Sequence, residues 1–149
     1  MLKAYQALQG REIWKHDGPF IEKYQPTFGP GVKERFAFAK TIHDKDLTEQ
    51  ESLCEQAVRH INGLLADSSV LILPTLPGAG LKLDCSPDDM NAFRSKMSAS
   101  FCLGGLAGVP WITLPLAEID GAPLGVSLVS ACGTDAWLLE LSKALVQNR

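Results

Sequence analysis

Residues 106–129 read LAGVPWITLPLAEIDGAPLGVSLV, and this stretch decides the fold class. Two apolar runs, Trp111–Leu116 and Leu124–Val129, lie on either side of the segment Ile119-Asp120-Gly121. Asp and Gly favour turns, because both tolerate the backbone angles that a tight reversal requires. The short connection between two apolar runs therefore predicts an antiparallel β-hairpin.

A further strand and two helices are predicted around this hairpin. Val70–Leu73 is an unbroken apolar run, which is typical of a strand covered on both faces. Residues 74–85 then form a loop that contains Gly and Pro. Ser86 provides a helix N-cap, and Pro87 takes the first helical position. The side chains predicted to face inward are Met90, Phe93, Met97 and Phe101 on that helix, and Trp137, Leu138, Leu141 and Leu145 on a closing helix capped by Thr134 or Asp135.

The first 66 residues predict a helical segment. Apolar side chains at a spacing of three, beginning with Leu2 and Tyr5, indicate a first helix. Asp17-Gly18-Pro19 is predicted to end it, because Gly and Pro terminate helices. Pro19–Tyr24 adds one short helical turn.

Two more helices are predicted before residue 67. Pro26–Gly31 is a loop by its Pro and Gly content, and Val32–Ile42 follows as a helix with Val32, Phe36, Phe38 and Ala39 inward. Thr48 and Glu51 have the spacing of a capping box and begin the third helix, which runs to about Ala66. Its apolar stripe consists of Leu47, Cys54, Val58, Ile61 and Leu65.

Composition excludes several classes of protein. The chain has 149 residues, of which 46% are hydrophobic and 21% charged, so it is neither disordered nor collagen-like. The net charge of -3 argues against a nucleic-acid partner. No signal peptide and no apolar run of membrane-spanning length is visible, so no membrane partner is predicted. The cysteines, which form no C-x-x-C pair, predict free thiols in a reducing compartment, the cytoplasm; they are Cys54, Cys85, Cys102 and Cys132.

Motifs for cofactor and metal chemistry are missing. The glycines of residues 104–108 lack the G-x-G-x-x-G spacing and follow a predicted helix, so they do not form a dinucleotide loop. His16, His43 and His60 lack the spacing of a metal site. We therefore predict no cofactor and no metal. Arg94 has two interpretations: it holds a carboxylate or carbonyl of a substrate, or it is a solvated side chain.

Beside these patterns, the chain resembles the carboxy-terminal region of the amidase signature family, including plant-type indole-acetamide amidases. The order of motifs carries the resemblance: a strand with P-T-x-P, a helix, L-A-G-x-P, a strand, D-G-x-P-x-G, a strand and a Leu-rich helix. The matching residues are Val70–Gly78, Phe93-Arg94, Leu106–Leu116, Asp120–Val129 and Thr134–Glu140, with a looser match over Pro26–Arg35.

The resemblance implies an α/β fold with a mixed β-sheet flanked by helices. Residues 1–149 would form the carboxy-terminal part of a single amidase domain, with a helical segment over 1–66 and a sheet-forming segment over 67–149. The family cleaves amides to acid and ammonia with a Ser-Ser-Lys triad. Lys96, Ser98 and Ser100 do not match the triad positions, so no catalytic residue is assigned. The resemblance implies an acyl pocket, for which the candidates are Thr75, Arg94, Met97, Ser98 and Phe101.

Several explanations of the missing triad stay open. The chain is a truncated piece of a full enzyme, a partner of a separate amino-terminal piece, or a relic that folds without catalysis. In the first two cases its partner is a small amide substrate once the amino-terminal half completes it. The alternative function is a non-catalytic interaction module or homodimer that covers an open sheet edge, and a thiol enzyme built on Cys102 is a third. An uncovered edge also predicts a chain that is marginally stable or prone to aggregate alone.

Overall fold

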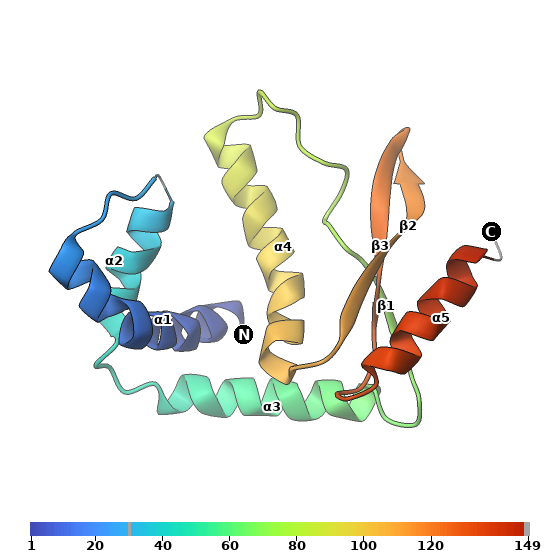
Figure 1. Cartoon of the computed structure of the whole chain (residues 1–149), viewed down its shortest axis with the longest axis horizontal. Helices are drawn as coiled ribbons and strands as arrows, with labels where there is room; N and C mark the ends of the chain where they lie inside the picture. The colour runs from blue at the N-terminus through green and yellow to red at the C-terminus, as the bar shows by residue number, and fades with distance from the viewer. Residues whose placement is uncertain (30, 148–149) are drawn as a thin grey trace. The chain divides into compact units, whose positions relative to one another are not determined.

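The computed structural model describes residues 1–29 and 31–147 (Figure 1). The chain divides into two compact units, residues 1–56 and 57–149, and the boundary along the sequence falls within helix α3, Thr48–Leu64. Pro30, which belongs to the predicted loop at Pro26–Gly31, lies outside the described residues, as do Asn148 and Arg149.

The first helix of unit 1 is longer than the sequence predicts. α1 spans Leu2–Tyr24 and continues through Pro19, so the predicted end at Asp17-Gly18-Pro19 is wrong. Gly18 is buried here for packing, since a Cβ at this position would lie 2.9 Å from the Trp14 indole. Pro19 removes one backbone donor without ending the helix. The helix ends instead at Gln25, whose left-handed backbone (φ 45°) lets its N–H donate to the carbonyl of Ile21.

Helix α2, Val32–Ile42, has the predicted bounds and packs against α1. Ala39 and Ile42 are buried, and Gly10 of α1 permits the close approach, because a Cβ there would lie 2.9 Å from Ile42 Cδ1. Val32 and Phe38, predicted to face inward, are 37% and 46% exposed. In this short helix the stripe that contacts α1 is narrower than the apolar pattern.

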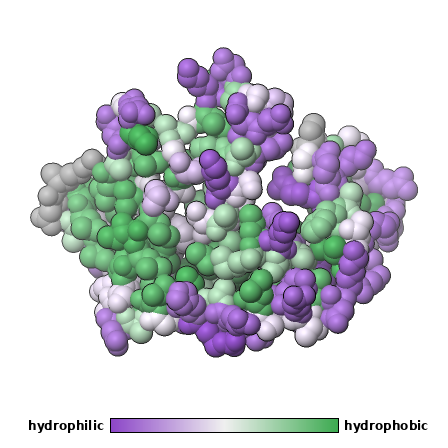
Figure 2. Space-filling view, turned by 180° about the vertical axis from the view of Figure 1, so that it is seen from behind, coloured by the Kyte–Doolittle hydropathy of each residue, from purple (hydrophilic) through white to green (hydrophobic). Residues whose placement is uncertain are grey.

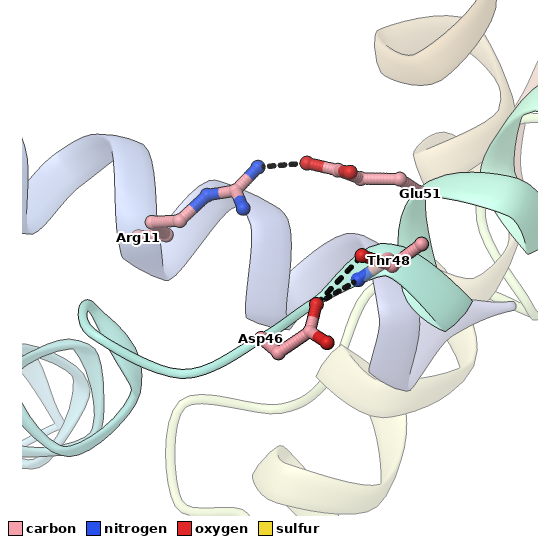
Figure 3. A network of polar contacts seen from close by, with 4 residues as sticks. All are labelled: Arg11, Asp46, Thr48 and Glu51. Carbon is pink, nitrogen blue, oxygen red and sulfur yellow. Dashed lines mark hydrogen bonds and ion pairs between the residues drawn. The ribbon is translucent and has the colours of Figure 1, made fainter.

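The start of α3 also differs from its prediction. The side chain of Asp46, not a Thr48–Glu51 capping box, satisfies the helix start: Asp46 Oδ1 accepts from Thr48 N at 2.9 Å and from Thr48 Oγ1 at 2.6 Å (Figure 3). These bonds hold the pKa of the Asp46 carboxyl below its usual value. Glu51 instead forms an ion pair with Arg11 of α1. The predicted stripe of α3 is confirmed at its buried members, Leu47, Cys54, Ile61 and Leu65.

Unit 2 is built on an antiparallel sheet. Its described strands are β1 (Leu71–Pro74), β2 (Trp111–Ile119) and β3 (Ala122–Val129), in the order β1-β3-β2. The predicted hairpin is confirmed, and its turn has positive φ at Asp120 (49°) and Gly121 (77°), as a type I′ turn requires. The α/β class is confirmed, although both described pairings are antiparallel where the resemblance implied a mixed sheet.

Helices cover the two faces of this sheet unequally. α5 (Asp135–Gln147) and α4 (Pro87–Ala107) lie on opposite sides of it in Figure 1. On the α5 face Leu138 packs against Leu114 and Leu128. The core of the other face is formed by the end of α3, the end of α4 and the three strands; its buried members are Ile61, Leu65, Val109 and Val129.

Part of the predicted core is exposed in the described structure. Ile72 of β1 is 68% exposed, so the prediction of a strand covered on both faces is wrong for this edge strand. Trp137 and Leu145 of α5, which were predicted to face inward, are each 42% exposed. Leu138 is the one apolar residue of α5 that is fully buried. Figure 2 shows hydrophobic residues gathered over the part of the surface that carries the sheet and α5.

The start of α4 is confirmed in detail. Ser86 Oγ accepts from the backbone N–H of Asp89 and donates to its carboxylate, and Pro87 is the first helical residue. Within Pro87–Ala107 only Cys102 is fully buried, and the predicted stripe of Met90, Phe93, Met97 and Phe101 is half-buried. Among the described residues, no helix combines the length and apolarity that would cross a membrane.

Candidate functional site

Three hydroxyl side chains meet on the sheet face opposite α5. Thr75 Oγ1 lies 2.7 Å from Ser127 Oγ and 3.3 Å from Thr113 Oγ1, and the Thr113 and Ser127 oxygens are 3.2 Å apart. We call Thr75, Thr113 and Ser127 the hydroxyl triangle. Ser127 is fully buried, Thr75 is half-buried and Thr113 is exposed.

The register of the sheet creates the triangle. Thr113 and Leu73 both lie opposite Ser127, on either side of the central strand, and Thr75 follows two residues after Leu73. Residues two apart point to the same face of a sheet. The backbone N–H of Thr75 donates to the carbonyl of Gly125 at 2.8 Å, which holds the start of the 74–85 loop against β3.

Gly125 supplies the room for this contact. A Cβ at Gly125 would lie 2.7 Å from Thr113 Cγ2 and 2.8 Å from Thr75 Oγ1. Gly125 also sits where β2 bulges, because two residues of β2, Pro115 and Leu116, oppose it between the paired positions on either side. Position 125 therefore requires a residue without a side chain, because Thr113 and Thr75 both approach its backbone closely.

Each hydroxyl of the triangle has one proton and two lone pairs. Thr75 Oγ1 donates to Thr113 Oγ1, and either oxygen can be the donor in the Thr75–Ser127 contact and in the Thr113–Ser127 contact. The triangle is thus a polar cluster whose hydroxyls can both donate and accept.

A separate cavity of about 530 Å³ lies between the 77–85 loop and the first turns of α4. Phe93 and Cys85 form part of its wall. Its charged lining is mixed: Lys82, Asp84, Asp89 and Lys96. A lining of both signs suits a polar ligand or water better than a purely apolar group.

The structure separates the five predicted pocket residues. Thr75 belongs to the hydroxyl triangle, whereas the other four lie along α4. Phe101 stacks on Trp111 with ring centroids 5.0 Å apart, Met97 and Ser98 are half-buried, and Arg94 is exposed. None of the five lines the 530 Å³ cavity. Their role in substrate binding stays a prediction.

The sequence reasoning missed Thr113, Ser127 and the role of Gly125. All three lie inside the D-G-x-P-x-G and strand motifs, but nothing in those motifs marks a hydroxyl cluster. The usable signal was the alternation along β3, which places Gly125 and Ser127 on one face. It becomes informative only with the correct register to β2.

Cysteine and metal chemistry find no site in the described residues. Cys102 is 2% exposed and its Sγ contacts the carbonyl of Ala99 at 3.2 Å, so a substrate cannot reach it, and this disfavours the thiol-enzyme alternative. Burial raises the pKa of the Cys54 thiol, which keeps it protonated. The four cysteines are free, and residues 1–29 and 31–147 contain no group of three or more His, Cys, Asp or Glu able to hold a metal.

The fold has a counterpart among solved structures. A solved amidase structure superposes with a TM-score of 0.77 over 98% of this chain and 35% of its own, at 22% identity, and this likeness shows the fold. No family model matches the chain.

The sequence relatives point the same way. The chain is 30% identical over 138 residues to Amidase 1 of Arabidopsis thaliana, which covers 93% of this chain and 32% of that protein. It is 26% identical to Outer envelope protein 64, chloroplastic, of the same plant, over 91% of this chain and 23% of that protein. The chain thus spans a third or less of the length of these curated relatives. The predicted resemblance is confirmed: the chain is related to the amidase signature family in sequence and fold.

Proposed function

We propose that this chain supplies part of an amide hydrolase, which cleaves the C–N bond of a small amide to give an acid and ammonia. The observation that carries the proposal is the 30% identity to Amidase 1 along 93% of the chain. The Ser-Ser-Lys triad would lie in sequence that this chain does not span, since the chain spans 32% of that relative. No nucleophile with a neighbouring base is present among the sites described above.

The contribution of this chain would be the sheet and the walls of the substrate site. The sheet face that carries the hydroxyl triangle is polar at one end and apolar at the other, where Trp111 and Phe101 stack. An amide substrate needs both characters, because its acyl group is apolar and its amide is not. Met97 and Phe101 would contact the acyl group, and Arg94 and Ser98 would form the polar rim.

The test is to determine the complete transcript that encodes Met1 and to assay the protein it specifies for ammonia release from primary amides. We expect an open frame that adds two serines and a lysine, and a product that releases ammonia. Replacing either serine by alanine should abolish the release. A complete frame without these residues, whose product releases no ammonia, would refute the proposal.

A second candidate is a non-catalytic interaction module. Two observations favour it: a relative named for the chloroplast outer envelope rather than for catalysis, and exposed apolar side chains in unit 2. The most exposed of these on the sheet is Ile72. A homodimer that covers this surface would have twice the 16.1 kDa mass of the chain in sedimentation equilibrium, and Ile72→Ser would return it to a monomer. A monomer with intact amidase activity in the complete protein would exclude this candidate.

A further inference from the structure

We propose that unit 1 binds a small aryl anion, an aromatic ring that carries a carboxylate or a sulfonate, in a cavity between α1 and α2. The cavity has a volume of about 710 Å³, and every residue that lines it belongs to unit 1. Its walls come from the second half of α1, the segment 25–28 that follows it, and α2 (Figure 1). The volume lies within the range of about 300–1,000 Å³ that is usual for small-molecule sites. No residue of the sheet contributes to it, so the inference goes beyond the proposed function.

The way α1 ends gives the cavity its shape. The left-handed backbone of Gln25 turns the chain out of the helix. The chain then brings Phe28 back against Phe36 of α2, with ring centroids 4.7 Å apart and ring planes tilted by 31°. This separation is that of an attractive aromatic pair. The end of α1, the following segment and α2 thus surround one space.

The walls of the cavity are rich in aromatic rings. Trp14 is 8% exposed, and Phe28 and Phe36 are half-buried. Ile21 and Pro26, which are also half-buried, add to the apolar lining. Aromatic rings attract one another in offset or edge-to-face arrangements beyond the effect of their buried area. An aromatic ring therefore gains more in this cavity than an aliphatic ring of the same size.

The charged groups of the lining leave one positive charge unbalanced. Lys40 Nζ donates to Glu22 Oε1 at 2.9 Å and lies 5.4 Å from the centroid of the Trp14 ring. These two opposite charges balance each other. Lys33 is exposed, and within residues 1–29 and 31–147 no carboxylate forms an ion pair with it. An anionic group on the ligand would provide that partner.

The same features disfavour other ligands. An organic cation would be repelled by Lys33, and the Trp14 ring that would attract it already holds the ammonium group of Lys40. A neutral aryl compound would leave Lys33 unpaired, and an aliphatic anion would lose the stacking on Phe28 and Phe36. The ring and the charge of the ligand should therefore each contribute to binding.

The experiment is an NMR titration of the ¹⁵N-labelled full chain with three probes that separate ring from charge. Benzoate has both, benzyl alcohol lacks the charge, and cyclohexanecarboxylate lacks the aromatic ring. We expect saturable shifts of the Trp14 indole N–H and of the Phe28 and Ala37 backbone amides with benzoate. The other two probes should bind about fivefold more weakly, since each loses one of the two contributions.

Two pairs of variants assign these contributions to residues. Lys33→Met should weaken benzoate binding about fivefold, the upper range for an exposed ion pair, and leave benzyl alcohol unchanged. Its control is Lys15→Met, which removes an exposed lysine of α1 outside the cavity. Phe28→Leu should weaken benzoate and benzyl alcohol alike, by about fivefold. Phe38→Leu, on the 46% exposed ring of α2 that does not line the cavity, should change neither.

Equal affinities for benzoate and benzyl alcohol, or an unchanged benzoate affinity in Lys33→Met, would overturn the proposal. Shifts that fall in unit 2 and not on residues 1–56 would overturn it as well. If the chain aggregates, the same probes and variants are compared in the complete protein by isothermal titration calorimetry. A complete protein that binds no benzoate would equally overturn the proposal.

Discussion

Gly125→Ala is the substitution for which the structure makes its sharpest prediction. The added methyl group would lie 2.7 Å from Thr113 Cγ2, 2.8 Å from Thr75 Oγ1 and 3.1 Å from Thr75 Cβ. Thr75 cannot simply move away, because its backbone N–H is bonded to the carbonyl of residue 125 itself at 2.8 Å. We therefore expect the edge strand β1 and the following loop to shift.

The size of the effect follows from opposing contributions. Overpacking of this kind costs about 1–3 kcal/mol. Separation of Thr75 from Ser127 leaves a fully buried hydroxyl without its shortest bond, which costs about 1–2 kcal/mol more. Replacing glycine in a strand returns about 0.5–1 kcal/mol through the unfolded chain. The net expectation is a loss of about 2–3 kcal/mol in the free energy of unfolding.

Urea unfolding of the full chain followed by tryptophan fluorescence measures this loss, since one of its tryptophans, Trp111, lies on the same sheet face two residues from Thr113. Gly63→Ala is the matched control, because nothing lies within 4 Å of a Cβ at that position in α3. The control should raise stability by about 0.5–1 kcal/mol. Equal stability of the two variants would refute the claim that Gly125 is required by close approach.

Three further outcomes are expected. Leu65→Ala should cost about 2–5 kcal/mol in chemical denaturation, because this side chain is 1% exposed in the core of unit 2. Asp46→Ala should lower the melting temperature at pH 7, and the difference should disappear as the pH falls below about 4: the folded pKa is lowered, so the stabilisation is present above the ordinary pKa and is lost on protonation. Glu51→Gln should cost less than about 1 kcal/mol in a thermal melt, since its ion pair with Arg11 is partly exposed, and a larger loss would show that the pair acts through more than charge.

The elements of unit 2 could be predicted where local chemistry decides them. The Ser86-Pro87 start of α4 and the Asp120-Gly121 turn have side chains whose local bonds and backbone angles are specific to those positions. In unit 1, the two ends of the helix Val32–Ile42 could also be predicted, because a loop of Gly and Pro precedes it. Local signals failed where a residue serves packing, as Gly18 does in the interior of α1.

The hydroxyl triangle could not be predicted, because it depends on a register shift. Near the turn Ile119 pairs with Ala122, and continuing that register would place Thr113 opposite Leu128. The bulge between Leu114 and Ala117 moves the partner of Thr113 to Ser127. A shift of one residue changes the cross-strand neighbour and the face it shares. No short sequence motif predicts a bulge at this position of β2. Pro115 is consistent with a bulge, because proline has no backbone N–H to donate to the neighbouring strand.

Ammonia release by a chimera tests the central claim most directly. The 138-residue segment of Arabidopsis Amidase 1 that aligns with this chain is replaced by the chain, and the rate with a primary amide is compared with that of Amidase 1. If this chain supplies the sheet and substrate walls of an amide hydrolase, the chimera should release ammonia. A chimera that folds and yet releases none would contradict the account.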